Sequence, residues 1–371
     1  MPHMQVSRRK HVPCHSGRLR LAALLVALTA LARPGAAPAE ERLYVGNTDS
    51  GSLSVISVPR LEVVDTIEIG LYPDDVIASK DGKLVYANRV QSSGHPLSKH
   101  IGESGEVMAI DSATDRVLWR AGVAGWPQHL ALAPDGRRLF VPLYDHPRID
   151  VVDTERHEVV DRLPAALGSH GMKLSADGRR LYVGSMFMDM LLVIDLHTGK
   201  PVKRIAFKDA VRPFAFTRDE KRMYVQLSRL HGFEVVDLDK SRVVRRVLLP
   251  ELPADTKLPE FFPNTYNHGL ALSPDERLLF AAGSVADYVC VYSQPGLELL
   301  KTIPVGRDPN WIVFSKDGRR AFVSNRGSNT VSAIDVQDMR QIKQIAVGKY
   351  PQRMAVADTP AGQGNAPATT P

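Results

Sequence analysis

Polar side chains stand at one fixed distance before a series of turns, and they include residue types that bind anions and transfer protons. The turns carry Asp-Gly or a related pair, as at Asp81-Gly82. Seven positions before each turn the residue is always polar, and its type keeps changing: Asp74, Gln128, His170, Arg212, His268, Asn310 and Gln352. The next position adds Asp75, His129, Trp311 and Arg353. This polar ring is therefore the candidate functional site.

Three positions after each residue of the polar ring, the residue is small or apolar in six of seven units. These residues are Ile77, Ala131, Ala215, Ala271, Val313 and Ala355, and Lys173 is the exception. A varied polar rim above an apolar wall is the pattern that a ligand-binding site needs. A solvated channel mouth with no ligand would also be polar, so both interpretations stay open.

Two kinds of ligand suit these residues. Arg212, Arg353 and Lys173 can bind a small anionic group, because guanidinium offers paired donors to carboxylate or phosphate. His170, His268 and His129 can instead hold a metal or cofactor, since imidazole suits zinc, copper and iron. No compact spacing such as His-x-x-x-His accompanies them, so metal and cofactor stay unidentified.

The turns that place this ring repeat along the chain. Their spacings are 54, 42, 42, 56, 42 and 42 residues, and each unit contains four short β-rich runs separated by turn residues. An aromatic column keeps the same register: Tyr44, Tyr86, Phe140, Tyr182, Tyr224, Phe280 and Phe322. One four-stranded unit cannot bury both faces, so the units must stack into a ring. We therefore predict an all-β, seven-bladed β-propeller.

The β-rich runs at the two ends of the propeller predict how the ring closes. The propeller begins at Leu43–Gly46, which matches the second run of a unit, and ends at Arg353–Ala357, which matches the first run of a unit. We expect the C-terminal innermost strand to pair with the N-terminal three strands. The propeller then spans residues 40–358. The tail 359–371 is rich in Ala, Pro, Gly and Thr and is expected to be disordered.

Residues 1–39 are typical of an export signal. Basic residues precede an apolar run, Leu21–Ala32, and Ala37-Pro38-Ala39 forms a small-residue cleavage site. We therefore expect a periplasmic or secreted protein, exported through either the general secretory or the twin-arginine route.

The charge of the chain is balanced once the signal is set aside. The signal holds six Lys or Arg and no acidic residue, which leaves 41 basic and 41 acidic residues in the remainder. Nothing in that balance favours nucleic acid, and no later segment is apolar enough to cross a membrane.

The repeat units resemble those of the YVTN-repeat propellers. The likeness rests on Leu43-Tyr-Val-Gly-Asn47, Phe322-Val-Ser-Asn325 and Ile303-Pro-Val-Gly306. It implies a seven-bladed ring over essentially the whole chain after the signal. Related rings serve as surface proteins, as the propeller subunit of quinohaemoprotein amine dehydrogenases, and as lactonases, so the resemblance leaves function open.

Loops on the face of the polar ring supply a second candidate site. Met186-Phe187-Met188 is an apolar group in a position that has no core to fill, and we expect it to dock a protein partner if it is exposed. Two insertions reach the same face, one between Tyr86 and Asp111 and the other after Asp237.

The motifs favour binding over catalysis. The sequence has no Gly-x-Ser-x-Gly elbow, no Gly-rich phosphate loop and no Cys-x-x-Cys-His. We therefore expect an exported module that binds a protein partner or a small anionic ligand. The alternative is an enzyme or redox-complex subunit, either a lactonase-like hydrolase or an amine-dehydrogenase-type propeller. In it His170, His268, Arg212 and Lys173 would be the acid, base and anion-stabilising groups.

Overall fold

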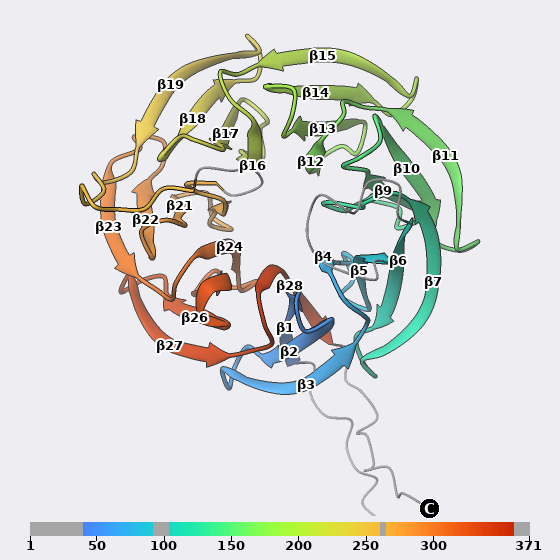
Figure 1. Ribbon diagram of the computed structural model, residues 1–371, viewed down its shortest axis with the longest axis horizontal. Coiled ribbons are helices and arrows are strands. Elements are labelled where there is room, and N and C mark those ends of the chain that lie inside the picture. The colour runs from blue at the N-terminus through green and yellow to red at the C-terminus, as the bar shows by residue number, and fades with distance from the viewer. Residues whose placement is uncertain (1–39, 92–103, 260–264, 360–371) are drawn as a thin grey trace, which may run out of the picture. The chain divides into compact units, whose positions relative to one another are not determined.

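A computed structural model describes residues 40–91, 104–259 and 265–359. These residues form seven antiparallel sheets of four strands, arranged around a common axis (Figure 1). The prediction of a seven-bladed β-propeller is confirmed. The predicted signal 1–39 and the tail beyond Thr359 lie outside the described residues, as do parts of both insertions.

Each blade has one strand beside the axis and one at the rim (Figure 1). The innermost strands are β28 (Pro351–Thr359), β4 (Pro73–Ala78), β8 (Ala131–Leu132), β12 (Ser169–Leu174), β16 (Val211–Phe216), β20 (Leu270–Leu272) and β24 (Pro309–Phe314). The second strands are β1 (Glu40–Asn47), β5 (Leu84–Gln91), β9 (Arg138–Pro142), β13 (Arg180–Ser185), β17 (Arg222–Leu227), β21 (Leu278–Gly283) and β25 (Arg320–Asn325).

The remaining strands build outward from these. The third strands are β2 (Ser52–Ser57), β6 (Ser104–Asp111), β10 (Arg148–Asp153), β14 (Met190–Asp195), β18 (Gly232–Asp237), β22 (Tyr288–Ser293) and β26 (Thr330–Asp335). The rim strands are β3 (Glu62–Glu68), β7 (Arg116–Ala124), β11 (Glu158–Pro164), β15 (Lys200–Ala206), β19 (Arg242–Leu248), β23 (Leu299–Pro304) and β27 (Arg340–Ala346). A 3-10 turn, η2 (Arg326–Ser328), follows β25.

The first blade closes the ring as predicted, with strand order β28-β1-β2-β3. The pairing of β28 with β1 runs from Glu40 opposite Thr359 to Asn47 opposite Pro351. Thr359 is buried, and its hydroxyl donates to the carbonyl oxygen of Glu40 at 2.7 Å. The strand therefore ends one residue later than the predicted boundary at 358, because this threonine still has a partner in β1.

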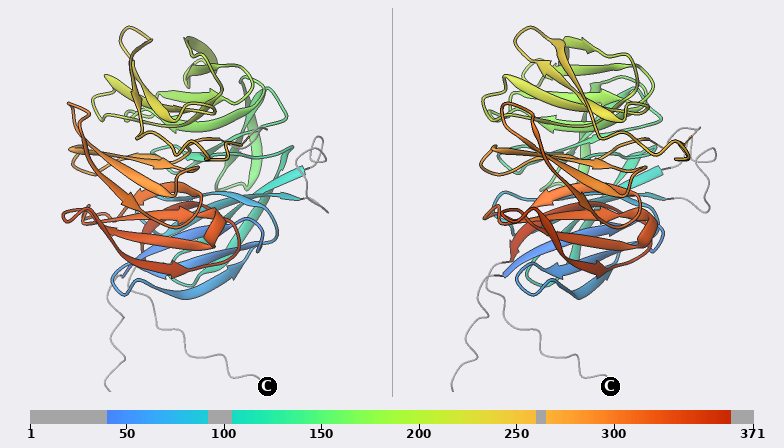
Figure 2. Two further views of the ribbon diagram at one scale, coloured as in Figure 1. Left: turned by 60° about the vertical axis from the view of Figure 1, so that its left-hand side comes forward. Right: turned by 90° about the vertical axis from the view of Figure 1, so that its left-hand side faces the viewer.

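The core lies between neighbouring blades, whose sheets are seen from the side in Figure 2. One cluster joins Tyr44 and Val55 of the first blade to Val76, Val85 and Met108 of the second. All members of the aromatic column are buried. Burying both faces of every inner strand makes the ring one cooperative unit. The part of the chain described here has no helix long and apolar enough to span a bilayer.

The repeated turn residues hold the strands in register. The Asp111 carboxylate accepts hydrogen bonds from the backbone N–H groups of Ala113 and Thr114 at 2.9 and 2.8 Å, which is the structural role expected of that column. Gly82 adopts a φ of +73°, and a Cβ there would lie 2.5 Å from the carbonyl oxygen of Asp358. The Asp-Gly turn of the second blade therefore fits against the closing strand only with glycine.

Candidate functional site

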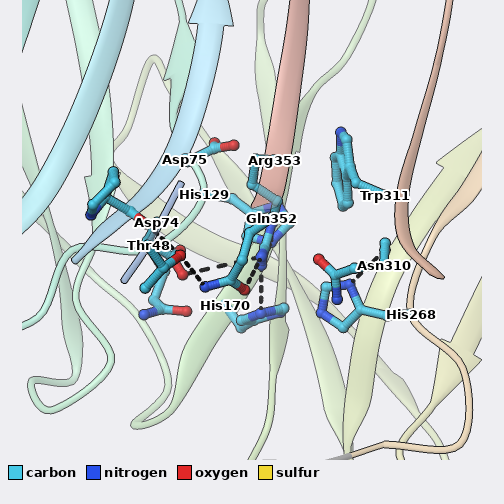
Figure 3. A network of polar contacts seen from close by, with 12 residues as sticks. Thr48, Asp74, Asp75, His129, His170, His268, Asn310, Trp311, Gln352 and Arg353 are labelled. Atoms are coloured by element: carbon cyan, nitrogen blue, oxygen red, sulfur yellow. Dashed lines mark hydrogen bonds and ion pairs between the residues drawn. The ribbon is translucent and has the colours of Figure 1, made fainter. Parts of the chain in front are cut away.

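The innermost strands bring the predicted polar ring to the axis. β4, β12, β16 and β24 each carry a register irregularity against the second strand at the end where the ring residues stand. In β12, for example, it falls between Ser169 and Met172. Such a bulge redirects side chains. His170 stands in the bulge of β12, and it gathers with His268 and Arg353 in one cluster (Figure 3).

Arg353, on the closing strand, is at the centre of this axial cluster. Its Nε lies 3.0 Å from His129 Nε2, and its Nη2 contacts the same nitrogen and lies 3.0 Å from His170 Nε2. Nη1 donates to Gln352 Oε1 at 3.1 Å. The guanidinium also stacks 5.1 Å from the ring centroid of Trp311. Arg353 therefore joins residues of the first, third, fourth and seventh blades (Figure 3).

Three imidazole rings pack around this arginine. The ring centroids of His129 and His170 are 4.5 Å apart, and those of His170 and His268 are 5.5 Å apart. Burial lowers the pKa of all three histidines well below the usual value, and the charge of Arg353 lowers it further. All three are therefore neutral at pH 7. His268 Nδ1 lies 3.2 Å from the carbonyl oxygen of Asn310, to which it donates.

Two carboxyl groups adjoin the cluster. Asp74 Oδ1 is 4.0 Å from Arg353 Nη1, and Asp74 Oδ2 is buried with no hydrogen-bond partner among the described residues. Asp75 Oδ2 accepts the backbone N–H of Leu130 at 2.6 Å. Burial raises the pKa of both carboxyls, that of Asp75 to about 7, while Arg353 acts in the opposite direction. Asp75 can consequently exchange protons near neutral pH, and the Asp74 carboxylate is a stronger base than an exposed one.

The other cations adjoin the cluster with different partners. Arg212 is buried, with Nε 2.7 Å from Ser228 Oγ and Nη1 2.7 Å from Met186 Sδ. Burial lowers the pKa of Arg212 to about 9, so it remains a cation at neutral pH. Lys173 is accessible to solvent. Partial desolvation by the surrounding protein lowers its pKa, and the negative charge of Asp75 opposes that shift.

The ring is more tightly packed than a solvated channel mouth. Buried members are Asp75, Gln128, His129, His170, Arg212, His268, Asn310 and Arg353. Asp74, Trp311 and Gln352 are half-buried, and Lys173 is exposed. The sequence left a solvated mouth and a ligand site open, and it did not foresee that side chains from the short innermost strands meet across the axis. The members of the ring that solvent reaches are Asp74, Trp311, Gln352 and Lys173.

One ion pair near the cluster was absent from the predicted site. Arg326 Nε and Nη2 bond both carboxylate oxygens of Asp308 at 2.9 and 2.8 Å, and the guanidinium lies 5.2 Å from the ring centroid of Tyr350. Its charge lowers the pKa values of Arg212 and His268. The available signal was the position of Asp308, two residues before Asn310 in the ring.

The described residues contain no group of three or more His, Cys, Asp or Glu side chains that could hold a metal ion. The Nε2 atoms of His129 and His170 face the guanidinium of Arg353. A cation at that position would compete with a positive charge already in place. The histidines are thus better suited to hydrogen bonding than to metal binding.

The Met186-Phe187-Met188 loop divides into a buried and an exposed part. Met186 is buried against Arg212, whereas Phe187 and Met188 are exposed. The Ser185 hydroxyl accepts the N–H groups of both exposed residues at 3.1 and 2.9 Å, which fixes the loop. Partner docking by this loop stays a prediction, and only Phe187 and Met188 have the exposure it requires.

Replacing Phe187 by Ser should lower the free energy of unfolding by about 1 kcal/mol or less, because the side chain is 45% exposed. Phe233→Ser is the matched control. That ring is fully buried, and its removal should cost at least about 3 kcal/mol in urea unfolding. Equal losses in the two variants would show that Phe187 is a packing residue and would remove the case for docking.

Comparison with known proteins adds a family to this geometry. Residues 42–355 match the model of a family described as "Lactonase, 7-bladed beta-propeller". Antigen Lp49 of Leptospira interrogans is 28% identical over 107 residues, which are 28% of this chain and 23% of that protein. The chain therefore spans less than a quarter of that relative.

Solved structures resemble the whole propeller. The periplasmic gluconolactonase of Pseudomonas aeruginosa has a TM-score of 0.68 at 16% identity, over 86% of this chain and 99% of that one. Hydrazine synthase of Kuenenia stuttgartiensis has a TM-score of 0.66 at 19% identity, over 80% and 92%. At such identities the likeness shows the fold alone.

Proposed function

Because the chain belongs to the lactonase seven-bladed β-propeller family, we propose that it hydrolyses a lactone at the axial cluster. The alternative enzyme reading of the sequence is thereby favoured over the binding module. The finer likeness to YVTN-repeat propellers remains a resemblance in the repeat units. Export to the periplasm remains part of the proposal, supported by the predicted signal and by a periplasmic gluconolactonase with the same fold.

The observation that carries this proposal is the state of Asp74. Its side chain is 12% exposed, and burial raises its pKa. Oδ2 has no hydrogen-bond partner among the residues that the structure describes. Hydrolysis requires a base that takes a proton from water. A raised pKa makes the Asp74 carboxylate a stronger base, and Oδ2 has a spare lone pair to accept that proton. We assign the base to Asp74.

The reaction follows from this role. As the water oxygen bonds to the carbonyl carbon of the lactone, one water proton passes to the Asp74 carboxylate and the carbonyl electron pair moves onto its oxygen. When the C=O bond re-forms, the bond between the carbonyl carbon and the ring oxygen breaks. Asp74 then returns its proton to that ring oxygen, and the product is the open-chain hydroxy acid.

Asn310 supports the same chemistry. Both polar atoms of its side-chain amide are buried and have no hydrogen-bond partner among the described residues. Its N–H group can therefore donate to the carbonyl oxygen, on which negative charge develops. Half-buried Trp311 follows it on β24 and offers an apolar surface to the ring of the substrate.

The test compares two Asp→Asn changes. Purified wild type is assayed by acid release from glucono-δ-lactone and δ-valerolactone, with the uncatalysed rate subtracted. Asp74→Asn should lower kcat on the order of 100-fold. Asp49→Asn, at an exposed position, should leave it unchanged. Wild-type rates no higher than the uncatalysed rate, or full activity of Asp74→Asn, would refute the proposal.

A further inference from the structure

We propose that Arg353 is a positioning residue that holds His129 and His170 as neutral imidazoles protonated on Nδ1. The tautomer assignment rests on hydrogen-bond geometry alone. Its role in turnover rests on the proposed hydrolysis.

The donor chemistry of arginine carries the first step. A guanidinium has five N–H donors and no acceptor. His129 Nε2 is 3.0 Å from Arg353 Nε, and His170 Nε2 is 3.0 Å from Nη2. Each of these ring nitrogens must therefore accept, which places the single proton of each neutral ring on Nδ1. The arginine thus selects one tautomer in two histidines that come from different blades.

The contacts of Arg353 separate this role from substrate binding. Its donors are directed to His129, His170 and Gln352. A guanidinium whose donors are engaged by side chains acts on a ligand through those side chains. We therefore assign Arg353 as a positioning residue, and direct binding of an anion by it stays an expectation from the sequence.

Holding the tautomer leaves one donor available. His170 Nδ1 is buried and has no hydrogen-bond partner among the described residues. With the proton held there, it is a buried N–H group without an acceptor, which is unfavourable. An oxygen atom of a ligand would relieve that cost. The recognised chemistry is consequently an oxygen acceptor such as a carboxylate or carbonyl group.

The charged and titratable groups around the two rings reinforce the neutral form. Positive charge comes from Arg353 and Arg212 at His170, and from Arg353 and Lys173 at His129. His268 also lies beside His170, with the rings edge to face. Protonating either imidazole would add a cation to this set. The two rings should therefore stay neutral over the pH range in which free histidine titrates.

The experiment is long-range ¹H–¹⁵N spectroscopy of histidine-labelled full-length protein between pH 5 and 8. Wild type should show three non-titrating imidazoles protonated on Nδ1: those of His129, His170 and His268, the last because its Nδ1 donates to the carbonyl oxygen of Asn310. In Arg353→Met the rings of His129 and His170 should shift toward protonation on Nε2, the tautomer preferred in water, or begin to titrate, whereas the His268 tautomer should stay. Arg42→Met is the control, because it removes an arginine that pairs with Asp115 instead.

The wild-type spectrum tests the tautomers of His129 and His170 even if Arg353→Met does not fold. Protonation on Nε2 in either ring of the wild type, or unchanged spectra in a folded Arg353→Met variant, would overturn the inference. If lactone hydrolysis is measurable, Arg353→Met should lower kcat more than it raises KM. Wild-type tautomers as described, in a protein that hydrolyses no lactone, would uphold this inference and refute the proposed function.

Discussion

Deleting residues 351–371 should abolish folding of the propeller. The deletion removes β28 and leaves β1 with an unpaired edge along the register from Glu40 to Asn47. It also takes away Ala357, which is buried between the first and second blades, and Met354, which is buried between the first and seventh. A typical domain has only about 5 to 15 kcal/mol of stability, and we expect this loss to exceed about 5 kcal/mol. Circular dichroism should show no cooperative thermal transition.

The matched control is a deletion of residues 360–371, which retains every described strand. Its melting temperature should equal that of the full chain. If the shorter protein lacking β28 still melted cooperatively near the wild-type temperature, six blades and an incomplete seventh would be self-sufficient. The pairing of β28 with β1 would then contribute little to stability.

Acidification from pH 7.5 to pH 5 should lower the free energy of unfolding. The folded pKa values of His129, His170 and His268 are well below the usual value, so below about 6.5 the unfolded chain binds more protons. At pH 5 each of the three histidines therefore lowers the free energy of unfolding. The stability that they provide is present above the unfolded pKa and is lost as the pH falls.

Asp75 acts with the opposite sign. Its folded pKa is raised to about 7, so its contribution is lost as the pH rises through that value and returns on acidification. Between pH 7.5 and 5 it restores about 2.5 kcal/mol, and Asp74 acts in the same direction. With three histidines acting against two carboxyls, we expect a net loss of stability on acidification.

Urea unfolding at the two pH values measures the balance. Asp75→Asn removes the opposing contribution, so its loss on acidification should exceed that of wild type by about 2.5 kcal/mol. A wild type that became more stable at pH 5 would contradict this expectation and would mean that Asp74 and Asp75 outweigh the three histidines. An Asp75→Asn variant that lost no stability on acidification would mean that the imidazoles can be charged inside the fold.

The architecture was predictable because it depends on period and pattern. The 42-residue spacing and the aromatic column from Tyr44 to Phe322 imply the number of blades, and the unpaired runs at the two ends imply their mutual pairing. Those signals are local and recur seven times. A prediction built on them tolerates errors at single positions, such as the strand end at Thr359.

The arrangement of the site was less accessible, because it depends on contacts that occur once. Arg353 and His129 are 224 positions apart, and no repeat predicts that one should donate to the other. The bulges that redirect side chains in β4 and β12 have no clear sequence signal. The register of the sequence repeat did identify which residues approach the axis. It could not distinguish a ring of solvent-exposed side chains from a buried, packed cluster.

The position of Arg353 on β28 also orders events during synthesis. A ribosome makes the residues of this strand after those of all other described strands, so a nascent propeller carries histidines without the arginine that sets their tautomers. The same short segment that fastens the first blade also completes the chemistry at the axis. Any activity of the axial cluster should therefore appear only after β28 has been made and has paired with β1.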